Sequence, residues 1–206
     1  TVNISGTAVV NVGNRYLMGG TNGGAGPTAI ATGVVTNQSG GTLNTDLDIR
    51  VGDAFITPTS DATYNLSGTG IINTNTTNVT TGSSIVIGRQ GTGKFIQTGG
   101  TANFNSPVVI GNREAATATT ANGLYRISAG DLNVNAPTPT WPLALSVAPN
   151  GAGEFRVVGD DATINVTGDL LVDSTANGTG KLAFELEAGD LLSQINVAGN
   201  ATFNAS

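Results

Sequence analysis

Short runs of alternating apolar and polar residues occur along the whole chain, and they return at a fixed interval. The run GKFIQ at residues 93–97 has counterparts in GLYRI at 123–127 and GEFRV at 153–157. The interval is about thirty residues, which is typical of proteins built from stacked repeats. Because alternation over several residues indicates a β-strand with one buried face, each run predicts a strand and the interval predicts a repeated unit.

One apolar residue marks the first strand of each unit. This column consists of Val35, Tyr64, Phe95, Tyr125, Phe155 and Leu182. A glycine stands two positions before each member except Tyr64, where the equivalent residue is Ala62. Since stacked units bury such residues against their equivalents, we expect the column to be a core ladder. A ligand-binding aromatic stripe is the alternative.

Two further strands complete each unit. A corner of small residues leads into a second strand, as in Thr98-Gly-Gly-Thr-Ala-Asn-Phe104, and a third strand follows, as in Val108-Val-Ile-Gly111. The pattern predicts an all-β parallel solenoid (β-helix) of about six to seven coils, with three short strands in each coil of roughly 30 residues. It is one domain over residues 1–206, with an irregular first coil at 1–32, regular coils at 33–182 and a terminal coil at 183–206.

An antiparallel β-sandwich or barrel is the alternative fold. Its sequence signal is hairpins at a spacing of about 8–12 residues, whereas equivalent residues here return at about thirty. The irregular stretches at 22–32, 57–62, 113–122 and 137–142 also lie at one place in each unit. Stacked coils tolerate insertions at one edge, so the solenoid explains both observations.

Composition narrows the function classes. Charged residues make up 11% of the chain and glycine contributes 30 residues, which favours strands and turns over helices. Regularly spaced apolar residues, 38% of the total, argue against disorder. A net charge of −6 with only 8 Lys and Arg supplies no basic face for nucleic acid. No apolar run has the length of a membrane helix, so we expect no membrane insertion in this segment.

Catalytic and metal chemistry have little support in the residues. The chain has no cysteine and no histidine, which removes the commonest general base and transition-metal ligand. Asp160 and Asp161 are adjacent, and adjacent strand residues point to opposite faces, so a corner role is expected. Asp46, Asp48 and Asp53 could supply oxygen ligands for calcium. We predict a non-enzymatic protein without a resident cofactor, with calcium as a weaker alternative and a polysaccharide-cleaving solenoid as the enzymatic one.

A glycan or partner contact is a second kind of candidate site. Arg126 and Arg156 occupy one outward column and could grip an acidic polysaccharide; solvated cations on an acidic surface are the alternative. Trp141 lies in a proline-rich stretch at 137–142 and could stack on a sugar ring, cap the coil edge or pack on a neighbour. Asn-x-Ser/Thr triplets are frequent, which is expected by chance in a chain so rich in Asn and Thr.

Residues 33–203 resemble a known family. The phrases GTGKFIQTGGTANFNSPVVIGN and GAGEFRVVGDDATINVTGDLLV are similar to the autotransporter-associated β-strand repeats of secreted bacterial proteins, including surface proteins with a PEP-type sorting tail. The closing segment, GTGKLAFELEAGDLLSQINVAGNATFNAS, is similar to the last coil of such arrays. The resemblance implies a right-handed solenoid located outside the cell or on the bacterial cell surface. It implies no catalytic residue.

The chain ends suggest how such a protein would act. Both ends read as strands inside a repeat, and an uncapped solenoid presents unpaired strand edges. We therefore expect a structural building block of a surface layer, fibre or matrix that forms a homo-oligomer or filament by end-to-end stacking. The expected edge residues are Val2, Ile4, Thr202 and Phe203. An adhesin or surface-polysaccharide-binding module that uses the loop edge is the alternative function.

Overall fold

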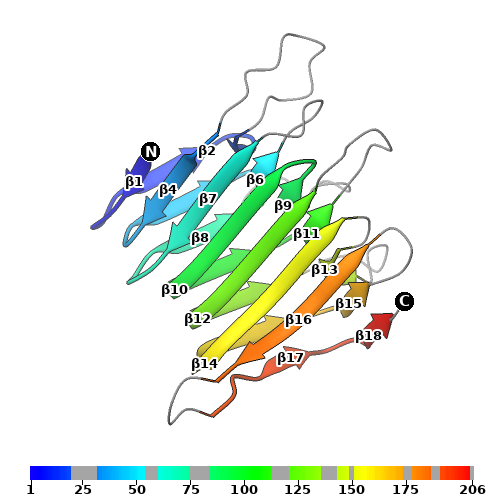
Figure 1. Ribbon diagram of the computed structural model, residues 1–206. Helices are drawn as coiled ribbons and strands as arrows, with labels where there is room; N and C mark the ends of the chain where they lie inside the picture. The colour runs from blue at the N-terminus through cyan, green and yellow to red at the C-terminus, as the bar shows by residue number, and fades with distance from the viewer. Residues whose placement is uncertain are drawn as a thin grey trace.

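A computed structural model describes residues 1–19, 32–53, 60–74, 84–112, 121–135, 143–148, 151–173, 178–186 and 191–204. These residues form eighteen β-strands and no helix. Every strand pair is parallel and joins a strand to the equivalent strand of the next coil. The predicted parallel β-solenoid is therefore confirmed, and the antiparallel alternative is excluded. Figure 1 shows the strands stacked along one axis, with the two termini at opposite ends.

The first side of the coil is a stack of seven strands in the order β1-β4-β7-β10-β12-β14-β16. Their bounds are Val2–Ile4, Val34–Gln38, Asp61–Leu66, Thr92–Phe104, Asn122–Val134, Ala152–Val166 and Thr179–Glu185. The long strands β10, β12 and β14 turn a corner and continue along the second side. That side also contains β2 (Val9–Val12), β5 (Thr42–Thr45), β8 (Ile71–Thr74) and β17 (Ile195–Val197).

The third side is a separate sheet of seven strands in the order β18-β15-β13-β11-β9-β6-β3. From β3 onward the bounds are Tyr16–Met18, Ile49–Asp53, Ile85–Arg89, Val108–Asn112, Leu143–Val147, Asp169–Asp173 and Ala201–Asn204. About five turns are stacked on both sides by neighbouring turns. The prediction of six to seven coils is slightly high in this sense, because the turns of β1–β3 and β16–β18 have a neighbour on one side only among the described strands.

Glycine makes one of the corners possible. Gly88 lies in β9 with a φ of 75°, a conformation that side-chain-bearing residues rarely adopt. A Cβ atom on Gly88 would collide with the backbone carbonyl of Asn122 in the next coil. The backbones of adjacent coils therefore approach each other so closely at this corner that only glycine fits.

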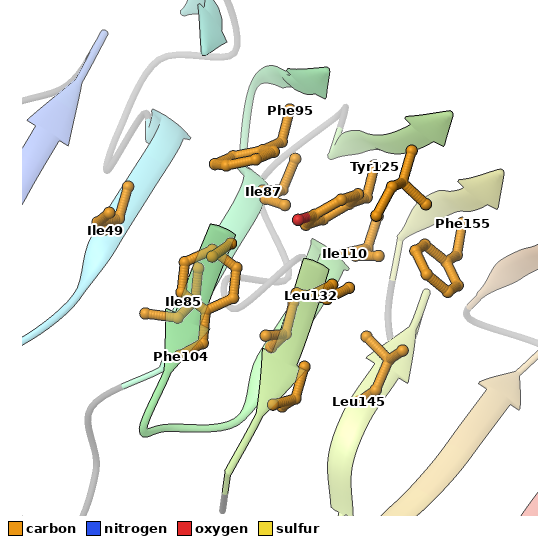
Figure 2. Packing of buried hydrophobic residues seen from close by; sticks show 14 of the residues in the cluster. Ile49, Ile85, Ile87, Phe95, Phe104, Ile110, Tyr125, Leu132, Leu145 and Phe155 are labelled. Atoms are coloured by element: carbon orange, nitrogen blue, oxygen red, sulfur yellow. The ribbon is translucent and has the colours of Figure 1, made fainter. Parts of the chain in front are cut away.

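The core contains an aromatic column from the first side. Tyr64, Phe95, Tyr125 and Phe155 pair in register on consecutive strands, and each is fully buried. The rings of Tyr64 and Phe95 stack with centroids 5.0 Å apart, and those of Phe95 and Tyr125 stack at 4.7 Å. Figure 2 shows Phe95, Tyr125 and Phe155 on successive strands, with labelled residues of the other two sides close by. Leu182 extends the column and is partly buried, because β16 is the last strand of the stack.

Val35 does not belong to this column, contrary to the prediction. Val35 pairs with Thr63, whereas Thr36 pairs with Tyr64 and is fully buried. A shift of one residue reverses the face of a side chain in a strand, so Val35 lies on the outer face. The inward Thr36 is tolerated because its hydroxyl lies 3.0 Å from the hydroxyl of Tyr16.

Candidate functional site

The C-terminal end of the stack is an open apolar surface. Among the described residues, strands β16, β17 and β18 pair with β14 and β15 on one side only. Between them lies a groove of about 460 Å³, which we call the terminal groove. It is lined mainly by Leu182, Phe184, Leu192, Ile195, Val197 and Phe203. Phe184 is 45% exposed and Phe203 is 59% exposed, although both occupy columns that are buried elsewhere in the stack.

The N-terminal end differs from the terminal groove. Within the part of the chain that the structure describes, strand β1 pairs only with β4, and β3 only with β6. Val2 is 46% exposed, but Ile4 and Met18 are 4% and 2% exposed. Ile4 and Met18 at the N-terminal end are therefore covered within their own chain, whereas Phe184 and Phe203 at the C-terminal end are exposed.

The four expected edge residues fall into different positions. Val2 and Phe203 point along inward columns at opposite ends and are exposed there. Ile4 also lies in an inward column but is buried. Thr202 pairs with Leu171 on the outer face of β15, so it borders the C-terminal edge without entering the terminal groove.

Sequence reasoning missed Phe184 and Leu192, which contribute large apolar surfaces to the terminal groove. Phe184 pairs with the fully buried Val157. The alternation Leu182-Ala183-Phe184 in the last first-side strand is the signal that could have identified it. Leu192 lies outside any strand, and no periodic pattern marks it.

An asparagine ladder runs the full length of the second side, which sequence reasoning also missed. Each side-chain amide after the first donates Nδ2–H to the Oδ1 atom of its equivalent in the preceding coil, with Nδ2–Oδ1 distances of 2.9–3.1 Å. The members are Asn11, Asn44, Asn73, Asn103, Asn133, Asn165 and Asn196. The recurrence of Asn directly after a buried apolar residue could have revealed the ladder.

The two arginines expected on one outward column lie next to each other, but Arg156 is paired with carboxylates. Arg126 and Arg156 pair in register on β12 and β14. The Nε atom of Arg156 donates to Oε1 of Glu154 at 2.6 Å, and its Nη1 atom lies 3.5 Å from Glu185. The hydrogen bond from Arg156 lowers the pKa of Glu154 and raises that of Arg156. Among the described residues Arg126 has no ion pair, so it is the more available cation.

A shallow groove of about 290 Å³ lies on the same outer face. The outward side chains along it come from one column, Lys94, Leu124, Glu154 and Lys181. Lys181 Nζ lies 3.5 Å from Oε1 of Glu154. The groove therefore combines cations with one carboxylate and has no strong net charge.

The acidic residues of the calcium hypothesis contact arginines. Asp48 lies 2.9 Å from Nε of Arg15 and 3.4 Å from Nε of Arg50. Asp53 lies 3.3 Å from both Arg50 and Arg89. Burial raises the pKa of Asp48, and the nearby Arg50 and Arg15 offset part of that rise.

Asp46 also has interaction partners and is half-buried. No cluster of three or more residues suited to a metal ion occurs in the described part of the chain.

Asp160 and Asp161 lie at the corner of β14, as expected. The ladder between β12 and β14 shifts register there, and Gly159 has a φ of 64°. Oδ2 of Asp160 accepts a hydrogen bond from the backbone N–H of Leu191 at 3.4 Å. Trp141 and the stretch 137–142 lie outside the described residues.

Comparison of the chain with protein-family models, curated proteins and solved structures finds no match. In the described ranges no helix is long and apolar enough to cross a membrane. The features of the molecule that bear on its function are therefore the solenoid, its two ends and its outer face.

Proposed function

We propose that this chain is a non-enzymatic structural protein, a repeat building block that self-assembles through the open strand edges of its solenoid. The observation that carries the proposal is the terminal groove, where Phe184, Leu192 and Phe203 are 45%, 48% and 59% exposed beside strand edges that have no partner among the described residues. Exposed edge strands are templates for pairing with another chain, and a sizeable exposed apolar patch marks an interaction surface. A homo-oligomer or filament results from such pairing.

The setting we propose is the bacterial cell surface or the extracellular space, within a layer, fibre or matrix. The similarity to autotransporter-associated β-strand repeats supports this setting, and so does a cysteine-free chain rich in Gly, Thr and Asn. Right-handed winding, the rule for parallel strand crossovers, belongs to the same proposal. The absence of His and Cys from the chain supports a role without catalysis.

Sedimentation velocity over a concentration series tests the assembly. We expect the wild-type sedimentation coefficient to rise with concentration. Phe184→Glu places a charge in the terminal groove, which should move the association to about tenfold higher concentration or beyond. Leu124→Glu is the matched control, because it makes the same kind of change on the lateral face. A wild-type chain that stays monomeric throughout would overturn the proposal.

A second candidate function is binding of an anionic surface polysaccharide. It is favoured by Lys94, which is exposed beside the 290 Å³ groove, and by Arg126, which has no ion pair among the described residues. Retention on immobilised polygalacturonate tests it. We expect Arg126→Gln to weaken retention more than Arg156→Gln, because Glu154 already neutralises Arg156. Equal and unmeasurable retention of wild type and both variants would contradict this role.

A further inference from the structure

We propose that the outer face of the second side binds the flat surface of a crystalline, uncharged polysaccharide through its asparagine ladder and the column of side chains beside it. This face is a lateral surface of the internal coils, so the contact is separate from the strand edges that the proposed function uses. It is also separate from the arginines and lysines of the first side. The inference therefore goes beyond the proposed function and does not rest on it.

The face consists of two columns that run across five consecutive coils, and we call it the second-side face. Residues between the columns, such as Leu132 and Ile164, are fully buried, so their neighbours along the strand point outward. Coils repeat at about 4.8 Å, and the two columns lie roughly 6.6 Å apart along each strand. The members are Asn44, Asn73, Asn103, Asn133 and Asn165 in the ladder, and Thr42, Ile71, Thr101, Asp131 and Thr163 in the second column.

The ladder leaves hydrogen-bonding groups for a ligand. An asparagine amide has two N–H donors and a carbonyl oxygen with two lone pairs. Asn103 uses one N–H on Asn73 and one lone pair on Asn133. Its second N–H and second lone pair have no partner among the described residues. The ladder therefore presents one donor and one acceptor in each internal coil, and a hydroxyl group, which both donates and accepts, is the complement of that pair.

The ladder also fixes its own side chains before any ligand binds. The internal amides are joined to each other by Nδ2–Oδ1 hydrogen bonds of 2.9–3.0 Å. Ordering flexible side chains is a cost that normally weakens binding, and a surface that is already ordered avoids it. The face therefore offers a rigid array with a regular repeat, which suits a ligand whose hydroxyl groups also repeat.

The charge of the face indicates an uncharged ligand. Asp131 is the only charged residue in the two columns, and its Oδ2 atom accepts a hydrogen bond from Oγ1 of Thr101 at 3.3 Å. The first side, by contrast, carries Lys94, Arg126 and Arg156 on its outer face. An ionic ligand would lose hydration on the second-side face without gaining an opposite charge there, which is costly. A hydroxyl-rich neutral ligand exchanges water for amide and threonine groups instead.

The shape of the face favours an ordered surface over a single sugar chain. Its residues line neither the terminal groove nor the groove of about 290 Å³, so a single chain would be contacted on one flank only. Four strand spacings make the face about 19 Å long. A crystalline polysaccharide presents parallel chains with hydroxyl groups at fixed intervals, and it can contact several coils at once. Many weak contacts that form together give a useful combined affinity.

Retention on microcrystalline cellulose and on crystalline chitin tests the proposal, because both solids are ordered and uncharged. We expect the wild type to bind at least one of them, with the same Kd at low and high NaCl concentration, since no ion pair contributes. Thr163→Lys places a charge on the exposed face without changing the ladder, and it should raise the Kd about tenfold or more. Ile71→Lys repeats the test in another coil, where the side chain is 38% exposed.

Thr63→Lys is the matched control. Thr63 points outward from the first side, in the column of Lys94, so this variant should bind like the wild type. Circular dichroism shows whether each variant is folded. Equal weakening by Thr163→Lys and Thr63→Lys would overturn the proposal, and so would the absence of retention on both solids.

Two further measurements identify the kind of ligand. Asp131→Asn removes the only charge of the face, so binding should be as tight as in the wild type or tighter; weaker binding would overturn the uncharged ligand. Soluble cello-oligosaccharides should not displace the bound protein, and displacement would indicate a single-chain site instead. Adsorption to growing ice in place of both solids would assign the face to ordered water and overturn the proposal. Sedimentation measures self-assembly separately, so the proposed function is judged by its own result.

Discussion

The phenol of Tyr125 donates a hydrogen bond to Oε1 of Gln97 in the preceding coil, with an Oη–Oε1 distance of 2.7 Å inside the core. Nε2 of the same Gln97 donates to the backbone carbonyls of Gly100 and Asp131. Gln97 thus connects two coils at the corner between the first and second sides. Tyr64 and Gln38 form the equivalent pair at 2.5 Å, so this device occurs twice in the stack.

Tyr125→Phe should destabilise the solenoid. The substitution removes the hydroxyl that donates to Oε1 of the fully buried Gln97. Leaving this oxygen without its hydrogen bond costs about 1–3 kcal/mol. Urea unfolding measures the loss. Thr101→Val is the control, because its hydroxyl bonds to Asp131 at an exposed position, and its cost should be smaller. Unchanged stability of Tyr125→Phe would contradict the account of the corner.

Gly88→Ala should be among the most damaging small substitutions. The left-handed backbone costs about 1–2 kcal/mol for a residue with a Cβ atom, and the collision with the Asn122 carbonyl adds to it. Gly33→Ala separates the two effects, since Gly33 has a φ of 68° but open space around a Cβ atom. Thermal unfolding should show a clearly larger loss for Gly88→Ala. Equal losses would mean that close approach of the coils is not limiting.

Asn103→Ala should weaken the stack by breaking the asparagine ladder in its middle. Asn103 donates to Asn73 and accepts from Asn133, so two hydrogen bonds of about 0.5–1.5 kcal/mol each are lost. Asn196→Ala removes one such bond at an exposed end and should cost less. Urea unfolding compares the two variants. A larger loss of stability for Asn196→Ala than for Asn103→Ala would contradict this account of the ladder.

Asp48→Asn should change how stability depends on pH. Burial raises the pKa of Asp48 in the folded state, so the folded protein binds this proton more tightly than the unfolded chain does. The contribution of this group to stability is therefore fully present below its unfolded pKa of about 3.9 and is lost as the pH rises through the folded value. Relative to the wild type, Asp48→Asn should gain stability between acid and neutral pH. A relative loss over that range would show that the pairs with Arg15 and Arg50 dominate.

The coil could be predicted from the sequence because two periods coincide in it. Alternation marks the strands, and the interval of about thirty residues aligns Phe95, Tyr125 and Phe155, so that parallel stacking is the arrangement that buries all three. The small residues at the corners indicate the same stacked fold, because only glycine tolerates the close backbone contact at position 88.

The remaining features depend on contacts that no local pattern encodes. Val34, Val35 and Thr36 are all β-branched, so propensity does not say which of them points inward, and the predicted column is one residue early at Val35. Asp48 and Asp53 read as isolated carboxylates in the sequence, because their arginine partners come partly from other coils. The exposure of Phe184 and Phe203 in the terminal groove likewise depends on three-dimensional contacts that no local pattern states.

Hydrogen–deuterium exchange at low and high protein concentration tests the central claim most directly, because an amide that joins a new strand ladder becomes protected. We predict that concentration slows exchange in β1–β3 and in β16–β18, while β10 and β12 in the middle of the stack are unchanged. Phe184→Glu should abolish the effect. Association without added protection at these end strands, or with protection on the lateral face, would contradict assembly through open strand edges.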